Sequence, residues 1–102
     1  MKLIKNILLA GSNGFIGSNL RSSLKNKVSV VSLDYSDKKG EKDFINLDLT
    51  DLDKVEKFAE KCIRFDALIF LVGLAHFKGQ DRDFLEFKKI NYQTLVNFLH
   101  AL

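Results

Sequence analysis

The sequence predicts an α/β fold, a partial parallel sheet of about four strands with helices on both faces, and three observations favour it. Short apolar runs alternate with longer amphipathic stretches, which is typical of parallel strands joined by helices. The first apolar run passes directly into a glycine-rich segment, Gly11–Gly17. The 102 residues are 46% hydrophobic and 28% charged, which suits one globular domain spanning residues 1–102.

The first half of the chain contains three predicted strands and one predicted helix. Ile7–Ala10 is continuously apolar, as expected of a strand that is covered on both faces. A helix follows, because the apolar residues of Ile16–Leu24 recur every four positions. Val28–Leu33 is a β-branched second strand. After a polar loop, Tyr35–Asp43, the segment Phe44–Leu47 is a short third strand.

The second half of the chain predicts two helices around the most hydrophobic strand, Ala67–Val72. Thr50 has the form of a helix N-cap. The helix that it opens has one apolar side, made of Leu52, Val55, Phe58, Ala59 and Cys62. A loop over Gly73–Arg82 leads to a second capping pattern at Asp83, after which a single helix is expected to reach the end of the chain.

The glycine-rich segment has the composition of a phosphate-binding turn. It follows the first strand and opens the first helix, which is the context in which such a pattern is informative. One glycine permits a sharp turn, one lets the backbone approach a pyrophosphate, and one lets helix and strand pack closely. The Gly-x-x-Gly-x-x-Gly spacing is one residue wider than the commonest dinucleotide pattern. We predict a Rossmann-type fold in which Gly11, Asn13, Gly14, Phe15, Ile16 and Gly17 bind the cofactor.

Two aspartates follow predicted strands. Asp34 closes the second strand, where a carboxylate can accept hydrogen bonds from the adenosine ribose diol and repel a 2′-phosphate. It therefore favours NAD over NADP, and the alternative is an aspartate that merely faces solvent. Asp48 follows the third strand, where it can reach the adenine edge. Turn or capping chemistry beside Thr50 is an equally open interpretation of Asp48.

The sequence resembles the extended short-chain dehydrogenase/reductase family, which comprises NAD-dependent nucleotide-sugar epimerases and dehydratases. The Gly11–Gly17 segment is similar to the phosphate loop of that family, and Asp34 to its ribose-binding acid. Phe70–His76 stands where the family carries a motif after its fourth strand, and Asp83–Asn91 is similar to a helix that holds a family asparagine. The resemblance implies further NAD contacts from Asp48, Leu49, Leu71, Val72, Gly73 and Asn91.

The resemblance also implies that this chain contains no catalytic residue. In the family a Ser or Thr and a Tyr-x-x-x-Lys pair carry out the chemistry, and they lie beyond the equivalent of Leu102. Tyr35–Lys39 has the same spacing, but it follows the second strand at the adenosine end, so we assign it no catalytic role. His76 and His100 are too far apart for a metal site. The lone Cys62 excludes an internal disulfide and is expected to be buried.

We therefore expect the NAD-binding portion of a nucleotide-sugar epimerase, dehydratase or ketoreductase. The intact parent would oxidise and reduce a sugar carbon through NAD, with the sugar nucleotide as a partner of the parent only. Leu74–His76 and the Glu86–Asn91 segment are most similar to bacterial polysaccharide-synthesis epimerases and 4-ketoreductases. The alternatives are a non-catalytic dinucleotide-binding module or truncated relic, and a piece that serves in protein interaction.

Charge and hydropathy bear on the remaining partners. The net charge is only +3 and the lysines are scattered, so we expect no nucleic-acid binding. No apolar run approaches the ~18 residues of a membrane span, and we expect a cytoplasmic protein. The last predicted helix is apolar on more than one face, at Phe87, Ile90, Leu95, Val96, Phe98, Leu99 and Leu102. We expect self-association through this helix or through the fourth strand.

Overall fold

The computed structural model describes residues 3–35, 43–61, 64–73 and 81–102, with no side-chain description for residues 81–83. The chain divides into two compact units. We call Met1–Leu47 with Ile63–Leu71 the sheet unit, and Asp48–Cys62 with Val72–Leu102 the helical unit. Several features named from the sequence lie outside the described residues: most of the loop after the second strand, Cys62, the Leu74–His76 part of the family motif and most of the loop Gly73–Arg82. The side chain of Asp83, the second predicted cap, is not described either.

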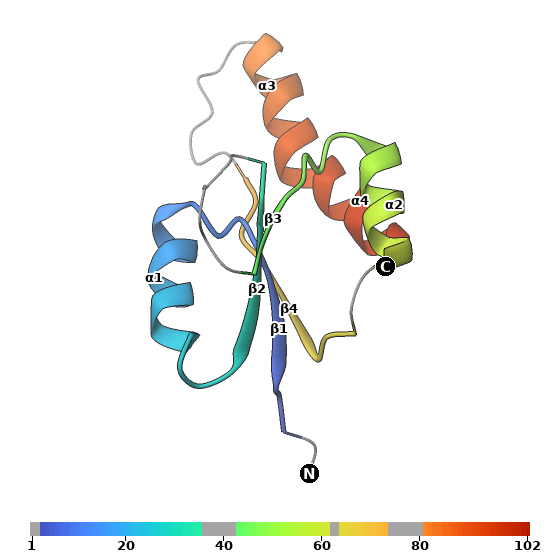
Figure 1. The fold of residues 1–102 in the computed structure, drawn as a ribbon. Helices are drawn as coiled ribbons and strands as arrows, with labels where there is room; N and C mark the ends of the chain where they lie inside the picture. The colour runs from blue at the N-terminus through green and yellow to red at the C-terminus, as the bar shows by residue number, and fades with distance from the viewer. Residues whose placement is uncertain (1–2, 36–42, 62–63, 74–80) are drawn as a thin grey trace. The chain divides into compact units, whose positions relative to one another are not determined.

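The sheet unit contains a four-stranded sheet in the order β3-β2-β1-β4 (Figure 1). The strands are β1 (Asn6–Ala10), β2 (Ser29–Asp34), β3 (Phe44–Asn46) and β4 (Ala67–Phe70). Each neighbouring pair is parallel. The predicted α/β fold with about four parallel strands is therefore confirmed, and the strand order is that of the first half of a Rossmann fold.

The core of the sheet unit lies on its inner strands. Leu9 and Ala10 of β1 and Leu33 of β2 are all 0% exposed, and Leu8 is 2% exposed. β1 lies between β2 and β4 in the sheet, so it has no edge open to solvent. Side chains alternate between the two faces of a strand, and the consecutive residues Ile7–Ala10 are all buried, so burial on both faces explains why the sequence of β1 is continuously apolar. Each fully buried leucine contributes roughly 1.5–3 kcal/mol to stability.

α1 (Phe15–Leu24) follows β1 and packs against β1 and β2. Its predicted apolar face is wrong at one end, because Ile16 is 65% exposed whereas Leu20 and Leu24 are half-buried. The residue of the first turn that is buried is Gly17. A glycine at this position lets the helix start lie directly on the preceding loop, which leaves Ile16 on the outer side.

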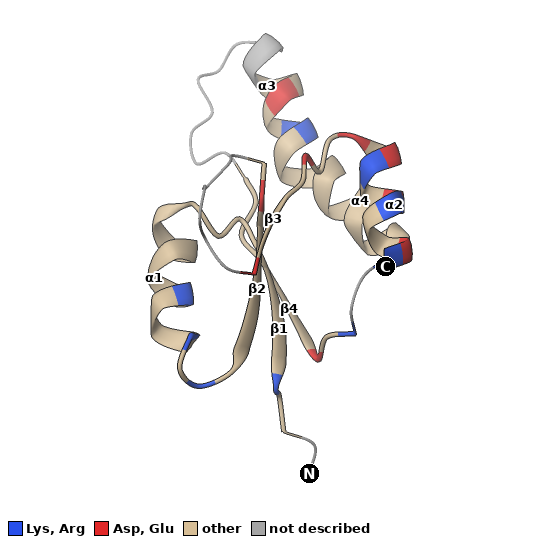
Figure 2. Cartoon of the chain, in the orientation of Figure 1, with Lys and Arg blue, Asp and Glu red and all other residues tan. Residues whose placement is uncertain are grey.

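The helical unit contains α2 (Leu52–Lys61), α3 (Asp81–Lys88), a π-helical turn (Lys89–Gln93) and α4 (Thr94–Ala101). α2 and α4 pack through Phe58 and Phe98, whose rings stack with centroids 6.1 Å apart. Acidic and basic side chains are interspersed along α2 (Figure 2). Among the described residues, no helix combines the length and apolar character that crossing a membrane requires.

Three boundaries differ from the sequence predictions. β4 ends at Phe70 rather than Val72, because its partner β1 ends at Ala10 and the chain then turns away. The predicted cap of α2, Thr50, is wrong by one residue. The cap is Asp51, whose Oδ1 accepts the amide of Lys54 at 3.3 Å. The final helix is not continuous, since the π turn separates α3 from α4.

Candidate functional site

The glycine-rich loop leaves β1 at a conformation that only glycine adopts readily. Gly11 has a φ of 85°, in the left-handed region. Its amide donates to the carbonyl of Leu33 at 2.8 Å, and the amide of Ser12 points to the same oxygen at 3.4 Å. The loop is thereby attached to the carboxyl end of β2, next to Asp34.

The three glycines of the loop have different roles. A Cβ on Gly17 would collide with the carbonyl oxygen of Gly11 and lie 2.9 Å from Cα of Ser12, so the close approach of α1 to the loop requires a glycine. Gly14 has an ordinary extended conformation, with φ −72° and ψ 172°, and a Cβ there would be at an ordinary 3.6 Å from Gly11. The fold thus requires Gly11 and Gly17. It does not require a glycine at the exposed position 14. A glycine there would let a ligand come close to the backbone, which is how the second glycine of a dinucleotide-binding loop serves.

The amino end of α1 is open. In this helix, whose residues are all described, the N-cap Gly14 supplies no side-chain hydrogen bond and the first turn contains no acidic residue. The first helical hydrogen bond runs from the amide of Ser18 to Gly14 at 2.9 Å. Phe15 and Ile16, which carry amides of the first turn, are 86% and 65% exposed. Such a helix start presents amide donors and a positive dipole end to an anion.

Asp34 is fastened to this loop. Its Oδ2 accepts the backbone amide of Asn13 at 2.9 Å, and its Oδ1 accepts the amide of Tyr35 at 2.8 Å. The carboxylate is half-buried at the end of β2. The sequence contains no signal for the first contact, because it joins a backbone amide to a side chain 21 positions away. The structure therefore brings Asp34 together with the loop, as a ribose- and phosphate-binding site requires.

Leu71 also belongs to the sheet unit, at the carboxyl end of β4. Its amide donates to the carbonyl of Ala10 at 2.8 Å, and its side chain is 36% exposed. The strand order reverses between β1 and β4, since β2 and β3 follow on one side and β4 on the other. In open α/β sheets a ligand crevice lies outside the carboxyl ends of the strands at this point.

Asp48 belongs to the helical unit, and its carboxylate takes part in a turn. Its Oδ1 accepts the hydroxyl of Thr50 at 2.6 Å and the amide of Thr50 at 2.9 Å. These two bonds, the hydroxyl first, lower the pKa of Asp48 below its ordinary value. The turn interpretation of Asp48 is thus observed. The contact with an adenine edge stays a prediction.

The other predicted residues of the helical unit are Leu49, which follows Asp48, and the residues Val72, Gly73 and Asn91. Leu49 is buried, and its carbonyl oxygen accepts the side-chain amide of Asn97 at 3.5 Å. Val72 is half-buried, and the neighbouring Gly73 is exposed. A Cβ on Gly73 would lie 3.3 Å from Oδ1 of Asn91. The structure therefore brings Gly73 and Asn91 together, although 18 positions separate them in the sequence.

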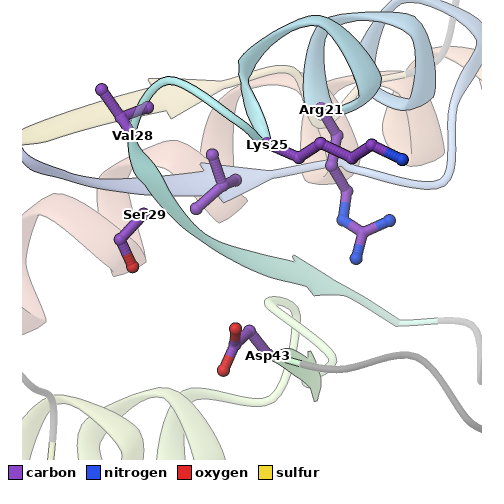
Figure 3. A pocket seen from close by; sticks show the side chains of 6 residues that line it. Arg21, Lys25, Val28, Ser29 and Asp43 are labelled. Carbon is purple, nitrogen blue, oxygen red and sulfur yellow. The ribbon is translucent and has the colours of Figure 1, made fainter.

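Two further findings concern chemistry outside the loop. Among the described residues, no three His, Cys, Asp or Glu side chains are grouped as a metal site. A shallow hollow is lined by Arg21 and Lys25 from α1 and its C-terminal cap, by Val28, Ser29 and Val30, and by Asp43 (Figure 3). It adjoins the amino end of β2, the end opposite to Asp34, and contains none of the predicted site residues.

Solved structures of several oxidoreductases and epimerases are similar to this chain. L-threonine dehydrogenase from Clostridium difficile is 29% identical, over 98% of this chain and 33% of that chain, with a TM-score of 0.76. UDP-glucose 4-epimerase from Thermus thermophilus, solved in complex with NAD, is 25% identical over 94% and 33%, with a TM-score of 0.75. A short chain dehydrogenase from Leptospira borgpetersenii, solved with bound NAD+, is 21% identical over 96% and 44%, with a TM-score of 0.78.

These similarities define what the chain corresponds to. It spans about a third of the length of the first two structures and less than half of the third. Among curated protein sequences, none matches it significantly. The sequence model of the NAD dependent epimerase/dehydratase family matches residues 7–102, nearly the whole chain. By this match, the chain belongs to the NAD dependent epimerase/dehydratase family.

Proposed function

We propose that this chain binds NAD at the carboxyl ends of β1 and β2. The phosphates lie on the Gly11–Gly17 loop and the open start of α1, and the adenosine ribose lies at Asp34. The observation that carries the proposal is the hydrogen bond from the amide of Asn13 to Asp34, at 2.9 Å. It fixes an acid next to a helix start that has no cap or acid of its own. In a dinucleotide the ribose diol, which would lie at Asp34, is followed by the pyrophosphate, which would lie at the start of α1.

The family membership and one solved relative support NAD as the ligand. The family model is named for NAD dependence, and the epimerase from Thermus thermophilus was solved in complex with NAD. Both oxygens of Asp34 accept backbone amides, and each keeps a second lone pair for a ribose hydroxyl. A 2′-phosphate at this place would meet a carboxylate, so NAD is favoured over NADP.

The remaining predicted residues are further contacts of the proposed cofactor site. Asp48 contacts the adenine edge, together with Leu49, which follows it in the chain. Leu71, Val72 and Gly73 contact the cofactor after β4, and Asn91 lies against Gly73. On this proposal residues 1–102 are the cofactor-binding domain, and none of them is catalytic.

The proposal extends to the intact parent of which this chain corresponds to a part. In that parent a sugar nucleotide is the substrate, and a sugar carbon is oxidised and reduced through NAD in an epimerase, dehydratase or ketoreductase reaction. The similarity of the Glu86–Asn91 segment to polysaccharide-synthesis enzymes favours a role in bacterial polysaccharide synthesis, in the cytoplasm.

Calorimetric titration with NAD and NADP tests the proposal. The wild-type chain should bind NAD more tightly than NADP. Asp34→Asn keeps an oxygen for the amide of Asn13 and removes the charge, so it should bind NADP relatively better with the loop intact. Asp34→Ala removes the loop attachment as well and should weaken both cofactors. Equal or tighter binding of NADP by the wild-type chain would exclude the proposed role of Asp34.

A loop variant supplies the second arm of the test. Gly14→Val places a branched side chain where the pyrophosphate approaches, so NAD binding should be lost. Circular dichroism of the same variant should match the wild type, because the fold does not require a glycine at this position. NAD binding that survives in Gly14→Val would contradict the placement of the phosphates on the loop.

A further inference from the structure

The π turn Lys89–Gln93 changes the hydrogen bonding of the last helices. The amide of Thr94 donates to the carbonyl of Lys89, five residues earlier. In an α-helix that amide would bond to the carbonyl of Ile90, four residues earlier. The π turn therefore takes away the amide that would normally pair with the carbonyl of Ile90.

The side chain of Thr94 takes the place of that amide. Its hydroxyl donates to the carbonyl oxygen of Ile90 at 2.5 Å. Thr94 is 1% exposed, so its hydroxyl is shielded from water, and a buried hydroxyl without a partner is costly. A residue at this position needs a hydroxyl to make the bond, which restricts the suitable side chains to serine and threonine.

The π turn determines where Asn91 lies. Each residue of an α-helix advances by about 100° around the axis, so removal of the extra residue would rotate Asn91 by about 100° relative to α4. In the observed turn Oδ1 and Nδ2 of Asn91 lie 3.3 and 3.5 Å from the position of a Cβ on Gly73. The side-chain amide of Asn91 thus lies beside Gly73, in the segment that follows β4, and its place there depends on the turn.

We propose that Thr94 is a positioning residue, whose hydroxyl holds the π turn and thereby presents the amide of Asn91 to Gly73. The inference rests on the proposed function only in that Asn91 and Gly73 are proposed cofactor contacts. Thr94 is buried and does not touch the ligand itself. A side-chain amide carries a donor group and an acceptor, and the π turn determines where both of them lie.

The contact can be measured by nuclear Overhauser effects between the side-chain amide protons of Asn91 and the α-protons of Gly73. The wild type and Thr94→Ser should both show the effect, because both have the hydroxyl. Thr94→Val and Thr94→Ala should lose it while the resonances of the sheet unit stay in place. An effect of wild-type intensity in either hydroxyl-free variant, or its loss in Thr94→Ser, would overturn the proposal.

The hydroxyl itself provides a measurement that does not need a variant. In the wild type the hydroxyl proton of Thr94 should exchange slowly with water, because it is buried and bonded to Ile90. If both hydroxyl-free variants fail to fold, this exchange rate decides the question. Fast exchange would contradict the bond from Thr94 to Ile90 on which the proposal depends, and slow exchange would support it.

NAD titration of the same variants separates the inference from the proposed function. Thr94→Val should bind NAD several-fold more weakly than Thr94→Ser, which should match the wild type. A wild type that does not bind NAD would contradict the proposed function and leave the Overhauser result intact. Full NAD binding by Thr94→Val without the Asn91–Gly73 effect would overturn the link between Thr94 and the cofactor site.

Discussion

A Cβ atom on Gly17, in the first turn of α1, would collide with the carbonyl oxygen of Gly11 directly after β1. The same oxygen lies at an ordinary 3.6 Å from a Cβ built on Gly14. The third glycine of the loop therefore belongs to the packing of the fold. The second glycine is available for binding.

Substitution by alanine should affect stability at Gly17 and NAD binding at Gly14. Gly17→Ala forces a shift of the loop or of α1, and overpacking of this kind costs about 1–3 kcal/mol in the free energy of unfolding. Gly14→Ala should change stability little and weaken NAD binding instead. Urea denaturation of both variants, with NAD titration of Gly14→Ala, checks this difference. A Gly17→Ala variant with wild-type stability would show that the loop shifts to accommodate the Cβ atom without a loss in the free energy of unfolding.

The start of α2 depends on Asp51 rather than on Thr50. Asp51→Ala removes the acceptor of the Lys54 amide, and loss of an N-cap costs about 0.5–2 kcal/mol. Thr50→Val, the matched control, should have a smaller effect on the free energy of unfolding, because its hydroxyl bonds the exposed Asp48. Chemical denaturation of the two variants measures the difference, and a larger loss in Thr50→Val would refute the assignment of the cap.

The pKa of Asp48 should depend on Thr50. The hydroxyl of Thr50 is the largest cause of the lowered pKa, so Thr50→Val should raise the pKa toward its ordinary value of 3.8. A carboxylate whose pKa is lowered on folding stabilises the fold above the unfolded pKa, and this contribution is lost as the pH falls through the folded value. Below pH 3.8 the stability of the wild type should thus fall more steeply than that of Thr50→Val. Carboxyl carbon shifts measured against pH give the pKa directly, and an unchanged value in the variant would count against this bond.

Asp66 should hold the start of β1 to the chain just before β4. Its Oδ2 accepts the amides of Lys5 and Asn6 at 2.9 and 3.0 Å. Asp66→Ala should destabilise the chain by about 1 kcal/mol, because two amides lose a charged acceptor at an exposed site. Hydrogen exchange at the amides of Lys5 and Asn6 should become faster in Asp66→Ala and less so in Asp66→Asn. Unchanged exchange in the alanine variant would mean that water replaces the carboxylate without cost.

Self-association is expected through β4 or the last helix. Within the described sheet β4 pairs with β1 alone, and it consists of the apolar residues Ala67–Phe70. On α4 and at its end, Leu99 and Leu102 are 54% and 46% exposed. Light scattering over a concentration series should show a rising mass, and Leu99→Ser with Leu102→Ser should reduce it if the helix is the contact. A monomer at high micromolar concentration would contradict this expectation.

The sequence predicted the parts of the molecule that depend on local pattern. β1 was found within one residue because continuous apolar character reflects burial on both faces. The glycine-rich turn between β1 and α1 was predicted because its glycines stand between an apolar run and an amphipathic stretch, and its binding of phosphates stays a prediction. The exposure of Ile16 was missed because helical periodicity does not reveal that Gly17 takes the buried place.

The features that the sequence did not predict depend on contacts between distant or backbone groups. The bond from Asn13 to Asp34 uses a backbone amide, which every residue except proline has. Asp51 and Thr50 are both good capping residues, and only the geometry distinguishes them. The π turn cannot be recognised from the sequence, because a threonine at position 94 is equally acceptable in a regular α-helix, where its backbone amide would bond to the carbonyl of Ile90.

The attachment of the loop to Asp34 has a consequence for how this site can change through mutation. A chain that exchanged its cofactor for one with a 2′-phosphate would have to replace the carboxylate with a neutral or basic group. A replacement that has no acceptor oxygen at this place would also release the amide of Asn13. On the proposed role of Asp34, one residue therefore influences both the choice of cofactor and the shape of the loop. A viable exchange needs either a substitute that still accepts the amide, as asparagine does, or a second mutation that holds the loop by other means.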